Sequence, residues 1–440
     1  MCLAVPARLI AVNDAIGTVE LTGATRDCSL LLVPEAKVGD WLLVHAGFAV
    51  QIVDEEEAQK TLEAFKENLK KLTLQEKQHT ADALLKRINA LHEPGETVRL
   101  MEVCGTHTVS IFREGLRQLL PSGIELVSGP GCPVCVTDQT YMDKALAYAE
   151  REDTIIATFG DMLKVPGSYS SLSEAQAKGA HIHVIYTPLE VIELSKKHPE
   201  KKIVFLAIGF ETTIAVICAT VKAVHEAGLK NVFFLVSHKL VPPALRALLD
   251  RQEGHIDGFI LPGHVSVIIG EEPYGFLPEE YGIPSCIAGF DGLEILSAIA
   301  NILEQRKTGN IVVGNTYHSV VMQKGNPVAQ AMMKEVYDIC DDAWRGIGII
   351  PNSGLALKDE YAAYDVERAL PIELEKPSLD PKGCQCGRVL QGLIKPSECP
   401  LFGKSCTADH PVGACMVSVE GSCAAWYKYG YSSGGSTWED

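Results

Sequence analysis

Six cysteines lie close together in the C-terminal part of this 440-residue chain, with the spacing C-x-C-x12-C-x6-C-x8-C-x7-C. Four thiolates complete the ligand set of a [4Fe–4S] cluster, which leaves two cysteines over. Zinc sites usually draw their ligands from CxxC-type pairs, and none of the six forms one. The pattern therefore favours iron–sulfur chemistry over zinc or simple packing. The six are Cys384, Cys386, Cys399, Cys406, Cys415 and Cys423.

A separate CxxC pair, Cys132 and Cys135, lies in the motif GPGCPVC between an expected strand and an expected helix. This spacing permits a disulfide and lowers the pKa of one thiol, as in thioredoxin-like proteins. It is also half of many zinc sites, and it occurs in purely structural turns. All three readings stay open for this motif alone.

Cys104 opens a third candidate group, VCGTH, which again follows an expected strand and precedes a helix. Amides at a helix N-terminus favour the thiolate form, and His107 could polarise a ligand or bind a metal. Ligands of open α/β sheets collect at the carboxyl ends of strands, where this motif is expected.

Two further residues near the N-terminus could bind metal. Removal of the initiator Met would give Cys2 a free α-amine beside its thiol, a chelating pair, although an incidental exposed thiol is the alternative. His45 ends an expected strand before Ala46-Gly47 and is either a second ligand or a buried core histidine. Weaker candidates are Glu211 in GFETT, His238 and His264.

Alternating residues predict a multidomain α/β protein that begins with a small β-barrel over residues 1–54. Its expected strands are 7–12, 17–22, 28–33, 40–44 and 48–53. Residues 55–95 predict a helical connector, with one amphipathic helix over 62–72 and a second one capped by Thr73 and ended by Pro94-Gly95. Strand-like and helical runs then alternate through 96–376, which predicts two α/β domains with parallel sheets. Residues 377–440 are expected to form the cysteine-rich region and a tail from Ser432.

The formal net charge of −17, without a basic cluster, argues against nucleic acid and anionic membranes as partners. No apolar run is long enough for a membrane span, and the N-terminus shows no export signal, so a cytoplasmic location is expected. A reducing compartment also disfavours a disulfide framework for the fourteen cysteines. The isolated ones in apolar segments, Cys28, Cys218, Cys286 and Cys340, are expected to be buried.

MCLAVPARL and VHAGFAVQIVDEEEA resemble the HypC family, and VCGTH, GPGCPVC, GFETT, LPGHVS and CMVSVEGSC resemble the HypD family. The two resemblances follow one another along nearly the whole chain, which is therefore similar to a natural fusion of two [NiFe]-hydrogenase maturation proteins. No cysteine position departs from the pattern.

The resemblance implies an OB-like barrel, two α/β domains and a C-terminal iron–sulfur region. It implies that Cys384, Cys399, Cys406 and Cys423 hold a [4Fe–4S] cluster, while Cys386 with Cys415 and Cys132 with Cys135 form a dithiol relay. Cys2 and Cys104 would hold iron between the modules, with His45 and His107 nearby.

By the same resemblance, the iron would receive cyanide from a HypE partner, acquire CO, and pass to the hydrogenase large subunit precursor. Because the two modules are fused here, we hypothesise that the barrel then swings out about Thr73 or Pro94-Gly95 while it stays tethered. The rival hypotheses are an iron–sulfur-dependent disulfide oxidoreductase acting on another protein and a zinc-binding scaffold.

Overall fold

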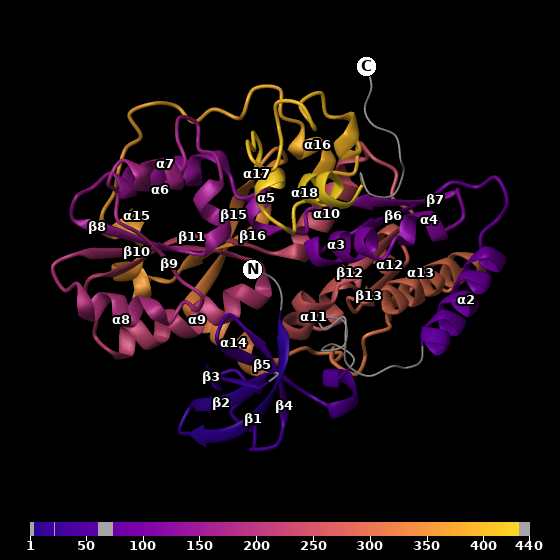
Figure 1. The fold of residues 1–440 in the computed structure, drawn as a ribbon, viewed down its shortest axis with the longest axis horizontal. Helices are drawn as coiled ribbons and strands as arrows, with labels where there is room; N and C mark the ends of the chain where they lie inside the picture. The colour runs from indigo at the N-terminus through magenta and orange to yellow at the C-terminus, as the bar shows by residue number, and fades with distance from the viewer. Residues whose placement is uncertain (1–3, 22, 60–73, 431–440) are drawn as a thin grey trace.

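The computed structural model describes residues 4–21, 23–59 and 74–430 (Figure 1). Expectations for Cys2, for the connector helix over 62–72, for the Thr73 cap and for the tail from Ser432 lie outside these residues. Within the described ranges, none of the helices has the length and hydropathy of a membrane span.

The N-terminal strands form a closed barrel in the order β1-β2-β3-β5-β4, as predicted. The bounds are β1 Val5–Asn13, β2 Ile16–Leu21, β3 Ala24–Ser29, β4 Trp41–His45 and β5 Phe48–Val53. The expected strand over 28–33 was placed wrongly, because β3 ends at Ser29. Leu30 and Val33 are buried in the barrel core from a turn, so their apolar character reflects packing rather than strand pairing.

Two α/β units follow, each with its own sheet (Figure 1). The first sheet is parallel throughout, in the order β14-β13-β12-β6-β7. Its strands are β6 Val98–Glu102, β7 Ile124–Ser128, β12 Gly258–Pro262, β13 Ser285–Ala288 and β14 Val313–Asn315. Two separated stretches of chain, 98–128 and 258–315, therefore build one sheet.

The second sheet has the order β15-β16-β11-β10-β8-β9. Its strands are β8 Thr154–Thr158, β9 Ile182–Val184, β10 Lys202–Gly209, β11 Val232–Lys239, β15 Tyr337–Trp344 and β16 Gly348–Leu357. Strands β8 to β11 pair in parallel, whereas the hairpin β15–β16 joins β11 antiparallel. The expectation of parallel pairing is thus correct for the inner strands and wrong for this edge.

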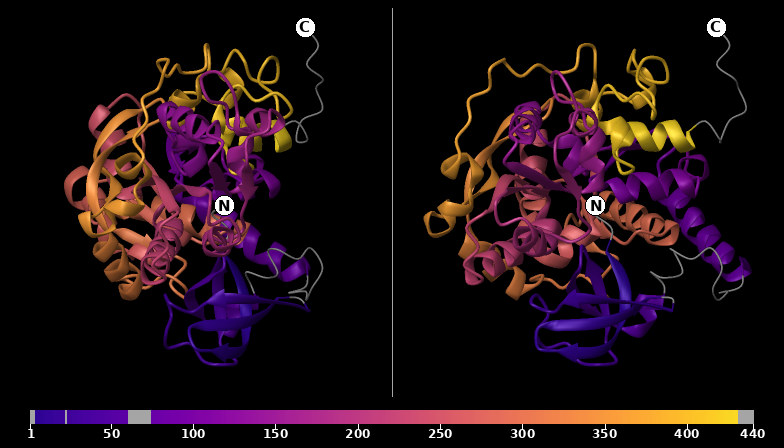
Figure 2. Two further views of the ribbon diagram at one scale, coloured as in Figure 1. Left: turned by 90° about the vertical axis from the view of Figure 1, so that its left-hand side faces the viewer. Right: turned by 60° about the vertical axis from the view of Figure 1, so that its left-hand side comes forward.

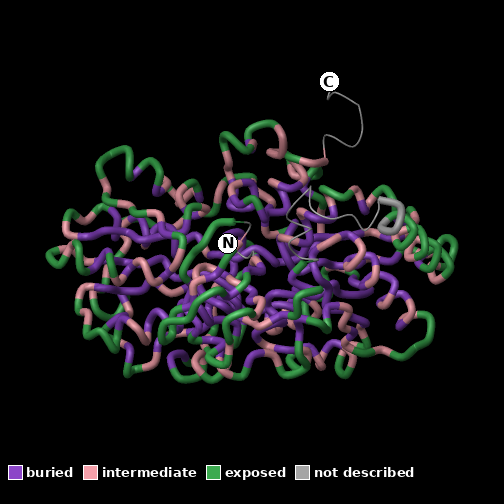
Figure 3. The backbone as a smooth tube through the Cα atoms, turned by 60° about the horizontal axis from the view of Figure 1, so that its bottom comes forward, coloured by how far each residue is buried: buried purple, intermediate pink, exposed green. Residues whose placement is uncertain are grey.

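Helices cover both sheets, and the central strands β8, β10, β11, β12 and β13 are almost wholly buried, whereas β9, β15 and β16 are partly exposed (Figure 3). The ones that matter for the site are α3 Gly105–Arg113, α5 Pro133–Val136, α9 Glu211–Glu226, α13 Gly292–Thr308 and α14 Pro327–Val336. The C-terminal segment adds α16 Cys386–Leu390, α17 Ala414–Val417 and α18 Ser422–Tyr429. Of the four isolated cysteines, Cys340 departs from expectation, because it is only partly buried.

The described part of the connector helix, α2 Leu74–Leu91, packs along α13 of the first unit. Ile88 is fully buried there, and Arg87 forms an ion pair with Glu304 of α13. The helix is therefore fixed to the α/β body.

The barrel and the cysteine-rich segment lie on opposite sides of the two α/β units, the barrel at the bottom and the cysteine-rich segment at the top (Figures 1 and 2). Asn326, at the start of α14, anchors the barrel: its side-chain amide donates to Leu32 O at 2.9 Å and to Val50 O at 3.0 Å. Residues far apart in sequence thus meet at the junction between the units.

Candidate metal and thiol-exchange site

Cys104 occupies the turn between β6 and α3, as predicted from VCGTH. Its backbone is extended, with φ −151° and ψ 125°, and it directly precedes the helix. The expected lowering of its pKa is wrong for the structure. Burial, followed by the charge of Glu420, raises the pKa of the thiol to about 12. Because only 5% of Cys104 is exposed, desolvation outweighs the helix amides.

A buried carboxyl group lies next to this cysteine. Glu102 accepts a hydrogen bond from Thr108 Oγ1 at 2.5 Å and one from the Cys104 amide at 3.3 Å. Burial raises the pKa of Glu102 to about 7, despite these donors. The sequence analysis missed it, although an acidic residue ending a buried strand immediately before VCGTH was a usable signal.

His107 is fully buried on α3. Its Nε2 donates to Gly289 O at 2.8 Å, and its Nδ1 has no hydrogen-bond partner among the described residues. Burial lowers the pKa of the imidazole to about 4, so it is neutral at pH 7. A neutral ring with one nitrogen fixed as donor keeps a lone pair on the other, as a metal ligand or proton acceptor requires.

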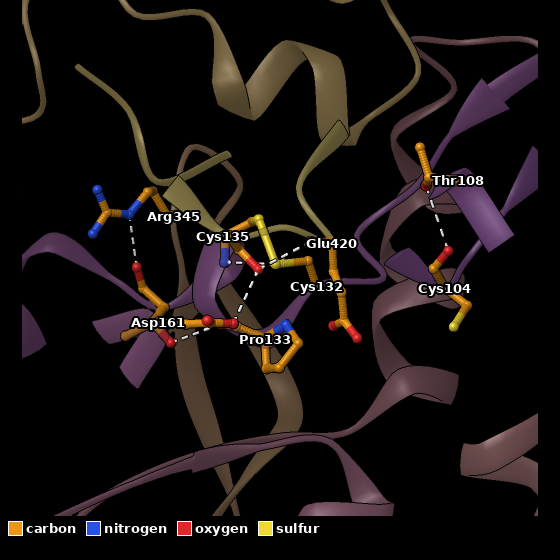
Figure 4. The surroundings of a disulfide bond; sticks show 10 residues. Cys104, Thr108, Cys132, Pro133, Cys135, Asp161, Arg345 and Glu420 are labelled. Carbon is orange, nitrogen blue, oxygen red and sulfur yellow. Dashed lines mark hydrogen bonds between the residues drawn. A yellow bond between two sulfur atoms is a disulfide. The ribbon is translucent and has the colours of Figure 1, made fainter. Parts of the chain in front are cut away.

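The CxxC motif lies directly against the Cys104 turn. Gly105 N donates to Gly131 O at 3.1 Å, and a Cβ on Gly131 would come within 2.3 Å of the Cys104 backbone nitrogen. Only glycine therefore permits this approach. Cys132 and Cys135 form a disulfide, which Figure 4 shows together with Cys104. The structure thus brings together two motifs that the sequence analysis had found separately.

Most of the six C-terminal cysteines converge. Cys384 Sγ and Cys386 Sγ are 3.2 Å apart, and the thiols of Cys386, Cys415 and Cys423 interact with one another. Hydrogen bonds from Cys386 and Cys415 lower the pKa of Cys423 to about 6. Helix α17, which carries Cys415, packs against α5 of the CxxC motif. The cysteine segment is therefore a direct neighbour of the Cys132–Cys135 disulfide.

The remaining two cysteines are placed differently. Cys406 lies close enough to Cys384 and Cys386 for their charges to raise its pKa, after burial as the main cause. Cys399 is only partly buried. Within the described ranges, no three His, Cys, Asp or Glu side chains are arranged to hold a metal ion as they stand. Soft thiolate donors fit iron–sulfur chemistry, but the geometry does not select four of the six.

A cavity of about 870 Å³ opens beside α3 and the C-terminal helices. Its walls include Thr106, His264, Phe290 and Glu420, and the first described residue of the chain, Ala4, also lines it. Ala4 is fully buried and shares a hydrophobic cluster with Cys104. The N-terminal segment of the barrel thus reaches the cavity of the VCGTH helix.

The other barrel candidate, His45, is also buried, with Nε2 3.1 Å from Thr213 Oγ1 of the GFETT motif. The neighbouring Glu211 accepts from Val241 N at 2.9 Å, and burial raises the pKa of its carboxyl to about 7. His45 therefore contacts the second α/β unit.

Arg345 is a further buried group that the sequence analysis missed. Its Nε donates to Thr137 O at 2.7 Å and its Nη1 to Gln139 Oε1 at 2.8 Å. Burial lowers the pKa of this guanidinium, and attraction to Cys386 and Cys415 opposes the shift. An arginine between two apolar stretches, Ala343-Trp344 and Ile347 to Ile350, was the available signal.

Comparison with known proteins matches both parts of the chain. Residues 79–430 match the HypD family model, described as "Hydrogenase formation hypA family", and residues 1–65 match the HupF/HypC family model. The hydrogenase maturation factor HypD of Azotobacter vinelandii is 41% identical over 358 residues, which cover 80% of this chain and 94% of that protein. The HypD of Escherichia coli (strain K12) is 39% identical over 76% of this chain and 89% of its own length. A putative hydrogenase expression/formation protein of Methanocaldococcus jannaschii is 42% identical, covering 78% and 95%.

Proposed function

We propose that this chain, which belongs to the HypD family and carries a HupF/HypC-family segment ahead of it, is the scaffold on which the Fe(CN)₂CO unit of [NiFe]-hydrogenase is assembled. Its family membership shows that it acts in hydrogenase maturation. Cys104 and Cys2 hold the iron in this proposal, with His107 and His45 as nearby groups.

The main support is the position of Ala4. It lines the same cavity as Thr106 of the VCGTH helix, although one residue begins the barrel and the other belongs to the first α/β unit. Cys2 stands two residues before Ala4 in the sequence, and two residues of chain span at most about 7 Å. Thiolates from the two modules would suit a soft, electron-rich iron centre.

The site also offers groups that act on such a substrate without ligating it. Phe290 lies between His107 and His264, with ring centroids 5.0 and 4.1 Å away, and forms an apolar wall. The Glu102 carboxylate accepts a hydrogen bond from the Cys104 amide, and the charge of Glu420 acts on the Cys104 thiol. These carboxyls could take the proton that Cys104 must lose before it binds iron, since a thiol with a raised pKa binds metal only on deprotonation.

The C-terminal segment is proposed to carry a [4Fe–4S] cluster on Cys384, Cys399, Cys406 and Cys423. The cluster would supply single electrons to the nearby dithiols. Cys386 with Cys415 and Cys132 with Cys135 form two exchanging pairs, and the packing of α17 on α5 supports their exchange. Cyanide would come from HypE, and the product would pass to the hydrogenase large subunit precursor, in the cytoplasm.

Infrared spectroscopy of the anaerobically purified protein tests this proposal, because metal-bound CN and CO absorb where proteins are transparent. Cys104→Ala and Cys2→Ala should each lose these bands and keep the visible absorbance of the cluster. Cys218→Ala, buried in the second unit, is the matched control and should keep both. Bands that survive in both test variants would remove iron holding from Cys104 and Cys2.

A further inference from the structure

One short segment, Trp344 to Gly346, connects the two cysteine pairs. On one side, Trp344 pairs with Thr137, and Arg345 N donates to Val136 O at 2.9 Å, directly after the CxxC motif. On the other side, Gly346 packs so closely on Gly387 that a Cβ on Gly346 would come within 2.5 Å of the Gly387 Cα. Gly387 follows Cys386 in the chain. The segment Trp344 to Gly346 therefore contacts the neighbours of both cysteine pairs and helps to set the position of one pair relative to the other.

The Arg345 side chain reinforces the first of these contacts. Its Nε and Nη1 bind Thr137 and Gln139, which follow Cys135 in the chain (Figure 4 shows Arg345 beside this loop). Only 4% of the residue is exposed. Its Nη2 is buried without a hydrogen-bond partner in the described part of the chain. Such an unsatisfied donor is costly unless it has a use.

The positive charge of Arg345 gives a functional reason for burying this guanidinium. Among its charge interactions, those with Cys386 and Cys415 are the largest. Because the site is buried, an unscreened cation acts more strongly on a neighbouring sulfur than it would in water. Arg345 thus binds the loop that follows Cys135 through hydrogen bonds and acts on the Cys386/Cys415 pair through its charge.

We propose that Arg345 is a positioning residue for disulfide exchange between the Cys132/Cys135 pair and the Cys386/Cys415 pair. This inference rests on the proposed function, of which it specifies the relay.

In the exchange, a thiolate of Cys386 or Cys415 attacks the Cys132–Cys135 bond. That bond breaks, a mixed disulfide forms, and the displaced sulfur leaves as a thiolate that takes a proton. The second thiol of the attacking pair then cleaves the mixed disulfide. The Cys132/Cys135 pair gains two electrons and two protons, and the Cys386/Cys415 pair loses the same.

Negative charge passes from sulfur to sulfur in both steps, and a fixed cation beside the sulfurs stabilises it without reorganisation. The hydrogen bonds from the same guanidinium fix the loop that follows the CxxC motif, which restricts the search for a geometry in which the sulfurs can react. Lysine would keep the charge and lose the fork that binds two acceptors at once.

The test traps the mixed disulfide in the full-length, anaerobically purified protein carrying Cys135→Ser, which leaves Cys132 without its partner. After addition of a mild disulfide oxidant, thiols are alkylated at intervals, and the linkage of Cys132 to Cys386 or Cys415 is quantified by peptide mapping. With Arg345 present, the mixed disulfide should accumulate. Arg345→Gln should form it at least tenfold more slowly, and Arg345→Lys at least threefold more slowly.

Arg251→Gln is the matched control. Arg251 Nη2 donates to Ile347 O on the same turn and its Nη1 donates to Gln391 Oε1, and neither of these partners belongs to a cysteine pair. Its rate should equal that of the parent. Visible absorbance and thermal midpoint verify folding, and Arg345→Lys serves as the test variant if Arg345→Gln does not fold.

Wild-type rates in both Arg345 variants would overturn the proposal, as would an equal slowing in Arg251→Gln. If no mixed disulfide forms even with Arg345 present, the relay fails and this inference with it. The infrared test on Cys104 and Cys2 still decides iron holding in that case.

Discussion

Asn326 should control how tightly the barrel holds to the α/β body. Its two amide hydrogens bind the carbonyl oxygens of Leu32 and Val50, and its Oδ1 caps α14 by accepting from Ala329 N at 2.9 Å. Asn326→Asp keeps the cap and turns both donors into an acceptor that faces two carbonyls. Each buried acceptor left unsatisfied costs about 1–3 kcal/mol. The lower bound for two is about 2 kcal/mol, or roughly a thirtyfold weaker complex at 1.4 kcal/mol per decade.

The assay uses a chain cut between residues 72 and 74, so that the barrel and the body associate as separate partners. Titration calorimetry should show the dissociation constant rising at least thirtyfold in Asn326→Asp. Gln330→Leu is the control on the same helix, because Gln330 donates its two bonds to Ile268 O and Lys324 O within the body. A change below threefold in Asn326→Asp, or equal weakening in Gln330→Leu, would refute the reasoning.

The same cut chain measures the value of the tether. A short link gives an effective concentration on the order of millimolar. The intact chain should therefore assemble its iron unit at any dilution, and the cut pair should lose the CN and CO infrared bands when diluted below its dissociation constant. Equal behaviour of the two would show that the tether contributes nothing to assembly.

Three further predictions concern the cluster ligands, a buried histidine and the glycine beside Cys104. Cys399→Ala and Cys406→Ala should each abolish the broad visible absorbance of the anaerobic protein, whereas Cys340→Ala should keep it; full colour in either of the first two would reject the ligand assignment. Burial lowers the pKa of His238 to about 3, so between about pH 6.5 and 3 the unfolded chain binds a proton that the folded chain does not, and stability falls as the pH falls. At pH 5 this costs about 2 kcal/mol, and urea unfolding should show His238→Gln losing correspondingly less stability between pH 7 and 5 than the parent. Gly131→Ala forces a Cβ onto the Cys104 backbone, so it should lower the thermal midpoint and remove the CN and CO bands; retention of both would contradict the contact.

The sequence predicted those parts of the fold that local patterns determine. The continuous buried apolar runs of β8, β10 and β11 identify them as strands from the sequence alone. The motifs around Cys104 and Cys132 were placed correctly at strand ends for the same reason. These assignments need only neighbouring residues.

No local sequence pattern shows that the chain leaves the first sheet after Ser128 and returns to it at Gly258. This return of the chain determines the geometry of the site. It places β6 beside β12 in one sheet, and the residues between them form part of the second unit, which His45 contacts. The apposition of Gly131 and Cys104, like the bridge made by Arg345, depends on tertiary contacts that spacing does not encode. The choice of four cluster ligands among six cysteines is likewise not encoded in the spacing.

The packing of α2 restricts how the barrel could leave the body to deliver its iron. A swing about Pro94-Gly95 would carry α2 away with the barrel, which breaks the Arg87–Glu304 ion pair and exposes Ile88. Burying one such side chain contributes roughly 1.5–3 kcal/mol, and Leu84, Leu85 and Leu91 pack on the same cluster. Either release separates the barrel from the body, so it breaks the bonds of Asn326, the contact of His45 with Thr213 and the bond from Ser319 to Glu57. It also exposes apolar barrel residues that share a hydrophobic cluster with the body, among them Phe48 and Val50. A release that leaves α2 in place avoids the additional exposure of the apolar face of α2. The expectation of a hinge at Pro94-Gly95 is therefore disfavoured, and delivery should proceed with α2 held on α13.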